Sequence, residues 1–190
     1  GGFGNGIISF ASEQELCSIQ PVSDGLRAVF ATDGLAVLQE RISPREGHVG
    51  RLWMLDGKVL CAVLVPPMDV GGGGPSGCMA DGRAALAARA WDPPERVKVG
   101  AQQLTEAAEA SWGSIEVISP AGCEDNAWLY FDLNLSCMST MPDPALVSDP
   151  DHLWPEGFDP YDRLASWVRS QLSVEDGASS EKPAKSLRLG

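Results

Sequence analysis

The chain has 190 residues, of which 44% are apolar and six are tryptophan, and its formal net charge at pH 7 is −12. This length and apolar content suffice for the core of one ordinary soluble domain. The negative charge argues against nucleic-acid binding and against docking on an anionic membrane. The longest apolar run, Val59 to Val65, is far shorter than the roughly 20 residues of a membrane-spanning helix. We therefore expect no membrane-spanning segment.

The composition of the two chain ends bears on N-terminal processing and on the extent of the folded domain. The sequence opens with Gly1-Gly2-Phe3 and not with methionine, which indicates a processed or truncated N-terminus and leaves room for a removed targeting peptide. The compartment therefore stays open. Residues 174–190 are polar with few apolar anchors, as in a disordered tail. The expected organisation is one domain over 1–173 and a tail over 174–190.

The first candidate element is a short helical turn, because Ser12 and Glu15 have the spacing of a capping box. An Asp33-Gly34 turn between apolar runs then predicts a β-hairpin, since Asp and Gly tolerate the positive φ of a type I′ turn. A helix over 26–40 is the alternative. Its two interior glycines would each cost about 1 kcal/mol, so the hairpin is favoured.

A second hairpin is predicted over residues 50–65, with Asp56-Gly57 as its turn. This register places Met54 opposite Val59, and it places Trp53 opposite Leu60. The glycine-rich segment 69–77 that follows is expected to be a loop that divides the hairpins from a more helical half.

The second half of the chain is expected to hold three helices and two strands. Residues 83–91 are Ala-rich and predict a helix that ends before Pro93-Pro94, and residues 101–112 predict an amphipathic helix capped by Gly113. Residues 114–119 and 127–135 predict two strands of the same sheet. The last helix has the clearest start, with Asp159 as N-cap and Pro160 in the first position.

Together these elements predict an α+β fold. We expect an antiparallel sheet of about six strands built from β-hairpins, with about three helices packed on one face.

Catalytic and cofactor signatures do not emerge from the sequence. The segment 71–77 lacks the Gly-Lys-Ser/Thr of a phosphate-binding loop, and the two histidines, His48 and His152, lie beside no nucleophile signature. The five cysteines show no zinc-binding spacing, although Cys123 and Cys137 flank a predicted hairpin and could form a disulfide across it. We predict no cofactor.

The acidic residues are concentrated in one segment. Between Val99 and Asp162 there are twelve Asp and Glu residues and no Lys or Arg, whereas acids and bases balance in the rest of the chain. A one-signed surface attracts cations or basic proteins. The segment therefore predicts an acidic face that meets a basic partner, the alternative being a merely solvated surface.

Residues 142–159 are the most distinctive part of that segment because acids and prolines alternate there with aromatic residues. Aromatic anchors among acids suit docking on a basic, partly apolar surface. Packing of the aromatics on their own domain is the competing interpretation, and convergent carboxylates could also hold Ca²⁺, although no EF-hand pattern is present. The candidate partner-binding residues are Asp149, Asp151, Trp154, Glu156 and Phe158.

The functional hypothesis is a non-catalytic accessory or structural subunit, or a protein-binding module, that meets a basic protein surface. The rivals are a small enzyme whose site is assembled from residues distant in sequence and a cation- or ligand-binding module that uses the acidic loop.

Overall fold

The structure is a computed structural model that describes residues 10–18, 38–66, 88–123, 127–135 and 141–177. The chain divides into two compact units, residues 1–158 and residues 159–190.

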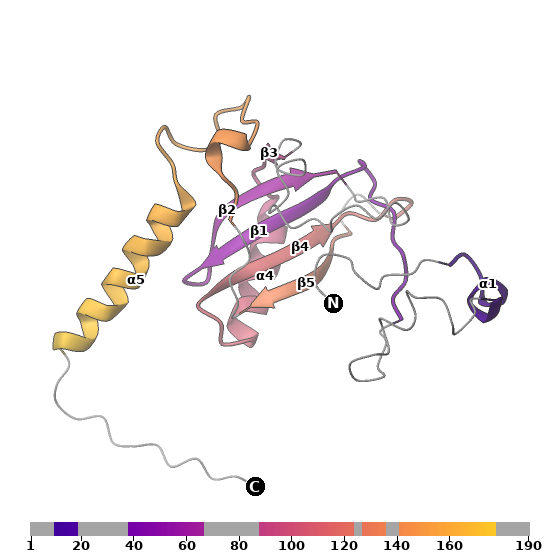
Figure 1. The fold of residues 1–190 in the computed structure, drawn as a ribbon, viewed down its shortest axis with the longest axis horizontal. Coiled ribbons are helices and arrows are strands. Elements are labelled where there is room, and N and C mark those ends of the chain that lie inside the picture. Colours follow the sequence, from indigo (N-terminus) through magenta and orange to yellow (C-terminus); the bar gives the residue numbers. More distant parts are fainter. Residues whose placement is uncertain (1–9, 19–37, 67–87, 124–126, 136–140, 178–190) are drawn as a thin grey trace, which may run out of the picture. The chain divides into compact units, whose positions relative to one another are not determined.

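The first unit is built on a five-stranded antiparallel sheet with the strand order β3-β2-β1-β4-β5 (Figure 1). The described residues also contain three α-helices, so the predicted α+β class is confirmed, with five strands where about six were expected. The strands are β1 (Val49–Leu55), β2 (Lys58–Val65), β3 (Arg89–Ala90), β4 (Trp112–Ile118) and β5 (Leu129–Leu135).

The β1–β2 hairpin closes through the predicted two-residue turn. Asp56 and Gly57 have φ angles of 52° and 70°, as a type I′ turn requires. Met54 pairs with Val59 as predicted, but the expected pairing of Trp53 with Leu60 is wrong because Trp53 lies opposite Cys61. A β-bulge makes Leu60 the extra residue of β2.

Helix α4 (Glu95–Ala107) begins and ends earlier than the sequence suggested. Pro94 is its N-cap, and Glu95 lies in the first turn, where the helix dipole favours a carboxylate. The helix ends where Glu109 adopts a left-handed φ of 50° and the amide of Ala110 donates to the Thr105 carbonyl. The predicted cap at Gly113 is wrong, because Gly113 lies within β4.

The helix predicted over 83–91 is also wrong in its described part. Residues 89–90 form β3, which pairs with Leu64 and Val63 of β2. This tertiary pairing overrides the helix propensity of an Ala-rich run.

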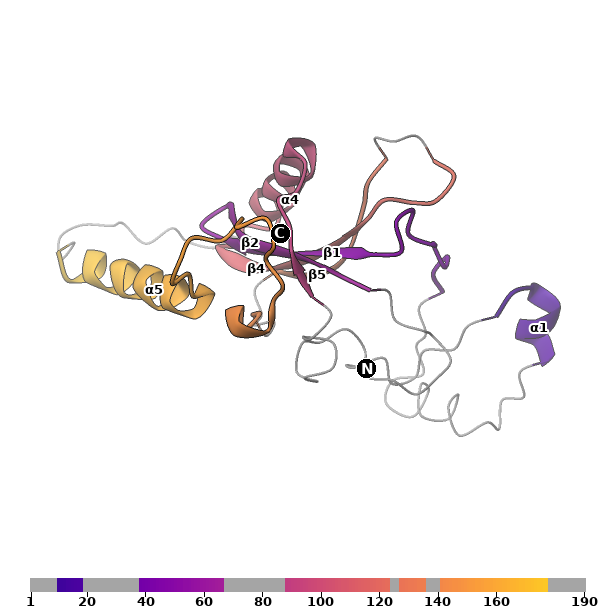
Figure 2. The same ribbon diagram turned by 90° about the horizontal axis from the view of Figure 1, so that it is seen from above.

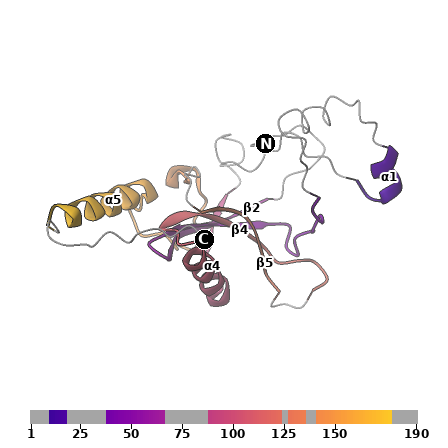
Figure 3. The same ribbon diagram turned by 90° about the horizontal axis from the view of Figure 1, so that it is seen from below.

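Helix α4 lies on one face of the sheet, as Figures 2 and 3 show from above and below, and the core lies between the two. Val97, Ala101 and Thr105 recur along one side of α4 and are fully buried. Val97 and Ala101 pack with the sheet in a cluster that includes Leu52, Met54, Ala62, Ile115 and Val117.

The other face of the sheet is also buried at β1. Arg51 and Glu116 lie opposite each other on β1 and β4 and form an ion pair whose side chains are 6% and 14% exposed. Trp53, two residues further along β1 and therefore on the same face, is 2% exposed.

Two further helices have the predicted starts. In α1 (Glu13–Ser18) the amide of Glu15 donates to the Ser12 hydroxyl, and the Glu15 carboxylate accepts from the amide of Ala11. In the second unit, α5 (Pro160–Gly177) begins with the Tyr161 amide donating to the Asp159 carboxylate at 2.8 Å. The helix runs four residues into the segment expected as a polar tail.

The Asp33-Gly34 turn, residues 26–37 of the alternative helix over 26–40 and the loop over 69–77 lie outside the described residues, and residues 38–40 form no helix.

Gly100 of α4 lies directly against Tyr130 of β5, because a Cβ at this position would collide with the Tyr130 hydroxyl. That hydroxyl donates to the Val97 carbonyl at 3.1 Å. Gly100→Ala should therefore destabilise the domain by about 1–3 kcal/mol through overpacking, although alanine is intrinsically the better helix former.

Chemical denaturation of Gly100→Ala and of Gly100→Ala/Tyr130→Ala measures this effect. In the Tyr130→Ala background the alanine at 100 should be neutral or stabilising. Equal destabilisation in both backgrounds would contradict the proposed collision.

Candidate functional site

Residues 141–158 form a loop that is attached to the edge of the sheet at β3. The amide of Ala90 donates to the Ser148 carbonyl at 2.8 Å, and the amide of Ser148 donates to the Ala88 carbonyl at 3.0 Å. Before this attachment, the 3-10 helix η2 (Pro144–Leu146) is capped by the side chain of Asp143, which accepts from the Ala145 amide. The two backbone hydrogen bonds of Ser148 anchor the loop to the sheet edge, so the residues that follow start beside β3.

Asp149 organises the next turn of the loop. Its two carboxylate oxygens accept the amides of Leu153 and Trp154, each at 2.9 Å. Desolvation acts to raise the pKa of Asp149, but the amides of Trp154 and Leu153 and the charge of His152 outweigh it and hold the pKa below its ordinary value. Asp149 therefore stabilises the loop as a carboxylate, with both oxygens engaged by the backbone.

Asp151 is paired with Arg89 of β3, with 2.6 Å between the charged atoms. Both side chains are more than half exposed, so the pair contributes little to stability. Its consequence is geometric, because it is a second link between the loop and β3.

The loop presents an aromatic pair at its end. Trp154 and Phe158 meet edge to face, with ring centroids 5.2 Å apart and planes at 61°. The amide of Phe158 donates to the Pro155 carbonyl, and Gly157 has a φ of 71°, so residues 155–158 form a tight turn. Both aromatic side chains remain only partly buried.

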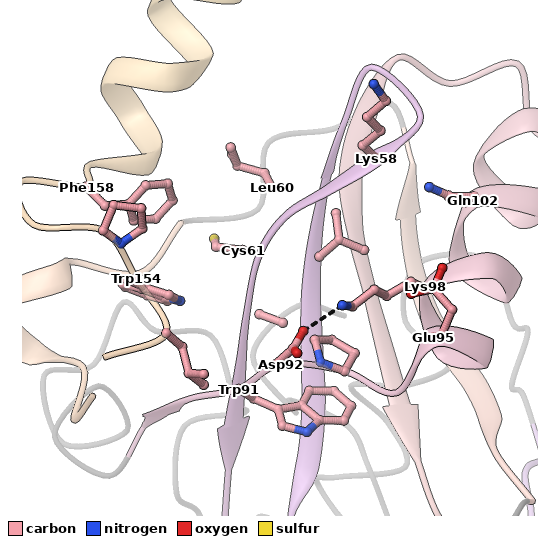
Figure 4. Close-up of a pocket in the computed structure, with 15 residues that line it drawn as sticks. Lys58, Leu60, Cys61, Trp91, Asp92, Glu95, Lys98, Gln102, Trp154 and Phe158 are labelled. Carbon is pink, nitrogen blue, oxygen red and sulfur yellow. Dashed lines mark ion pairs between the residues drawn. The ribbon is translucent and has the colours of Figure 1, made fainter. Parts of the chain in front are cut away.

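A groove with a volume of about 500 Å³ lies between this loop, β2 and the start of α4 (Figure 4). In Figure 4, Trp154 and Phe158 lie on one side of β2, and the side chains of α4 lie on the other. The groove is lined by Lys58, Val59, Leu60, Cys61, Ala62, Trp91, Asp92, Pro93, Glu95, Lys98, Gln102, Leu153, Trp154, Pro155 and Phe158.

The polar side chains of the groove lie mainly on the α4 side, apart from Lys58 at the start of β2. Asp92 and Lys98 form an ion pair at 2.6 Å, drawn as a dashed line in Figure 4. Glu95 is exposed and takes part in no ion pair recorded among the described residues. Burial raises the pKa of the Cys61 thiol to about 12, so Cys61 is a protonated, apolar part of the lining.

The predicted partner-binding residues separate into two groups. Trp154 and Phe158 line the groove, and Glu156 is exposed in the turn between them. Asp149 and Asp151 instead hold the loop in place. The acidic segment does not form one face throughout, because Glu116 is largely buried against Arg51.

Sequence reasoning missed the groove residues of β2, of α4 and of the segment just before α4. Cys61, Asp92 and Lys98 come together only through tertiary packing, and nothing in their local sequence marks them.

Cys123 is a free, exposed thiol, so it does not form the considered disulfide, and Cys137 lies outside the described residues. Across the described ranges, no group of three or more His, Cys, Asp or Glu side chains is arranged to hold a metal ion. None of the described helices is both long and apolar enough to cross a membrane.

Comparison with known proteins gives a partial structural likeness only. No family model matches the chain, and no curated protein matches it. Solved structures of the ATP-grasp ligase PsnB are similar over part of the chain. The complex with minimal precursor shows 17% identity and a TM-score of 0.36 over 53% of this chain and 28% of that chain. The complex with minimal precursor, Mg and ADP shows 14% identity and a TM-score of 0.40 over 65% and 33%.

The complex of PsnB with a phosphomimetic variant of the precursor, Mg and ADP shows 19% identity and a TM-score of 0.35, over 53% of this chain and 27% of that chain. The aligned region thus spans about a third or less of these structures. At such TM-scores we derive neither fold nor function from the likeness.

The two hydrogen bonds to Asp149 predict a pH-dependent loop. Because the pKa is lower in the folded loop than the ordinary 3.8, the carboxylate favours the folded loop fully above that pH. This contribution is lost as the pH falls below 3.8 and through the lowered pKa. We expect the amide resonances of Leu153 and Trp154 to shift over that range in NMR spectra.

The matched variants are Asp149→Asn and Glu156→Gln. Asp149→Asn should weaken protection of both amides at neutral pH and remove their acid-induced shift, whereas Glu156→Gln should leave both unchanged. An unaltered titration of the two amides in Asp149→Asn would contradict the assigned role.

The raised pKa of Cys61 predicts that the thiol is inert in the folded protein. Iodoacetamide at about pH 8, which modifies thiolates, should label the exposed Cys17 and Cys123 and spare Cys61 until denaturant is added. Peptide mass spectrometry measures the labelling of each cysteine. Labelling of native Cys61 as fast as that of Cys17 would show that the thiol is accessible and ionised.

Proposed function

We propose that this protein is a non-catalytic binding module, an accessory subunit of a larger assembly, whose groove receives a basic polypeptide segment with apolar anchors. The observation that carries the proposal is the Trp154–Phe158 pair, which is held at the groove by a hydrogen-bonded loop and left partly exposed. Partly exposed aromatic residues on a fixed scaffold are typical of binding hot spots.

The charge of the loop supports a basic partner. Residues 141–158 contain four acids, namely Asp143, Asp149, Asp151 and Glu156, and no Lys or Arg. Arg89 neutralises Asp151, and Glu156 makes no recorded ion pair within the described ranges. A surface of this sign attracts Lys and Arg side chains and disfavours acidic segments.

The chemistry of the groove favours binding over catalysis. Its one thiol, Cys61, stays protonated because of burial, and the described residues that line the groove include no histidine. Asp92 is held by Lys98, so the pair is not a free acid and base. The rival hypothesis of a small enzyme finds no nucleophile with an adjacent base in this groove.

A synthetic peptide tests the proposal directly. The probe is an acetylated and amidated nine-residue peptide in which lysine alternates with leucine, and the control replaces each lysine by glutamate. NMR titration should show that the lysine peptide shifts the resonances of Trp154 and Phe158 and that the glutamate peptide does not. Trp154→Ala should weaken binding by about tenfold or more, as expected for a hot-spot residue.

Two charge-reversal variants distinguish binding in the groove from attraction by the net negative charge of the protein. Glu156→Lys should weaken binding of the lysine peptide several-fold at low salt, and the effect should shrink as salt is added. Glu46→Lys makes the same change at an exposed residue that does not line the groove and should have little effect. Equal weakening by both variants, or no binding of the lysine peptide, would refute the proposal.

A further inference from the structure

The groove contains a strand edge that no described strand covers. β3 pairs with only two residues of β2, Val63 and Leu64, and one further bond runs from the Trp91 amide to the Ala62 carbonyl. Beyond Trp91 the chain forms no further strand before α4 begins at Glu95, and Lys58–Cys61 of β2 line the groove together with Asp92 and Pro93. Among the described residues, this part of β2 pairs on one side only, with β1.

The hairpin register fixes which backbone groups face the groove. Leu55 and Lys58 close a two-residue turn, so their amides and carbonyls point toward each other. Alternation along an antiparallel ladder then directs the amide and the carbonyl of the next residue, Val59, away from β1. An extended chain that enters the groove therefore meets one donor and one acceptor already aligned along a strand.

The two sides of this edge differ in chemistry. Trp154, Phe158 and the bulged Leu60 lie on one side, and Figure 4 shows the Asp92–Lys98 pair, Glu95 and Gln102 on the other, with Lys58 at the hairpin end of β2. Successive side chains of an extended strand point to opposite sides. A segment that alternates apolar and basic residues would direct its apolar side chains to the aromatic pair and its basic ones to Glu95.

We infer that the groove binds its partner by strand addition: an extended, alternating apolar and basic segment pairs with β2 at Val59, on the edge that no described strand covers. This inference rests on the proposed function and specifies its binding mode. Only Val59, which lies between the turn and the bulge, directs both its amide and its carbonyl outward, so the paired part of the segment is short.

Hydrogen exchange at single amides tests the inference with the same lysine–leucine peptide. In the free protein the Val59 amide should exchange fast, whereas the Cys61 amide, which lies in the β1–β2 ladder, should be protected. With saturating peptide, the Val59 amide should become protected by at least about fivefold, the factor expected for one net hydrogen bond.

A backbone variant gives an independent readout. Val59→Pro removes the outward amide at an edge position, where proline is tolerated, and should weaken peptide binding by about fivefold or more. Val59→Ala retains the amide and is the matched control. Thermal unfolding of both variants checks that the fold persists, and the exchange experiment on the unmodified protein stands alone if Val59→Pro does not fold.

The outcomes distinguish the two proposals. Protection of Val59 together with shifts at Trp154 and Phe158 supports strand addition. Shifts at Trp154 and Phe158 with no gain of protection at Val59 would overturn strand addition and leave the binding groove intact. No shift at either site would overturn both.

Discussion

The structure depends on the two prolines at 93 and 94. Proline has no amide hydrogen, so a strand that reaches this point cannot continue to donate to its neighbour. The last bond of the β3 edge comes from Trp91, and α4 starts directly afterwards with the amides of Val97 and Lys98 donating to the Pro94 carbonyl. One short segment therefore ends β3, starts the helix that covers the core and leaves the groove open beside β2.

Features that depend on local chemistry could be predicted from the sequence. The Asp56-Gly57 turn specifies a type I′ hairpin whatever surrounds it, and the Asp159 cap specifies the start of α5. The sequence also predicts the strands β4 and β5. The register beyond the turn was predicted only as far as Met54 and Val59, because a bulge depends on how a strand packs and leaves no signal in an apolar run.

Features that depend on distant contacts could not be predicted. β3 lies in an Ala-rich run, and only its pairing with β2 and with Ser148 makes it a strand. The end of α4 was misplaced because Glu109, and not a glycine, takes the left-handed position. In the candidate site the composition indicated the aromatic pair, whereas the bonds that engage Asp149 and the side of the groove formed by α4 arise from tertiary structure.

The buried ion pair of Arg51 and Glu116 joins β1 to β4, and these two residues are 65 positions apart in sequence. Two charges removed from water are costly unless they meet, and a shift of one residue between β1 and β4 would separate them. An apolar pair at these positions would tolerate such a slip far better. The ion pair thus favours the native register of the sheet. A misaligned sheet would leave both charges buried without a partner, whereas the native alignment of β1 with β4 neutralises them.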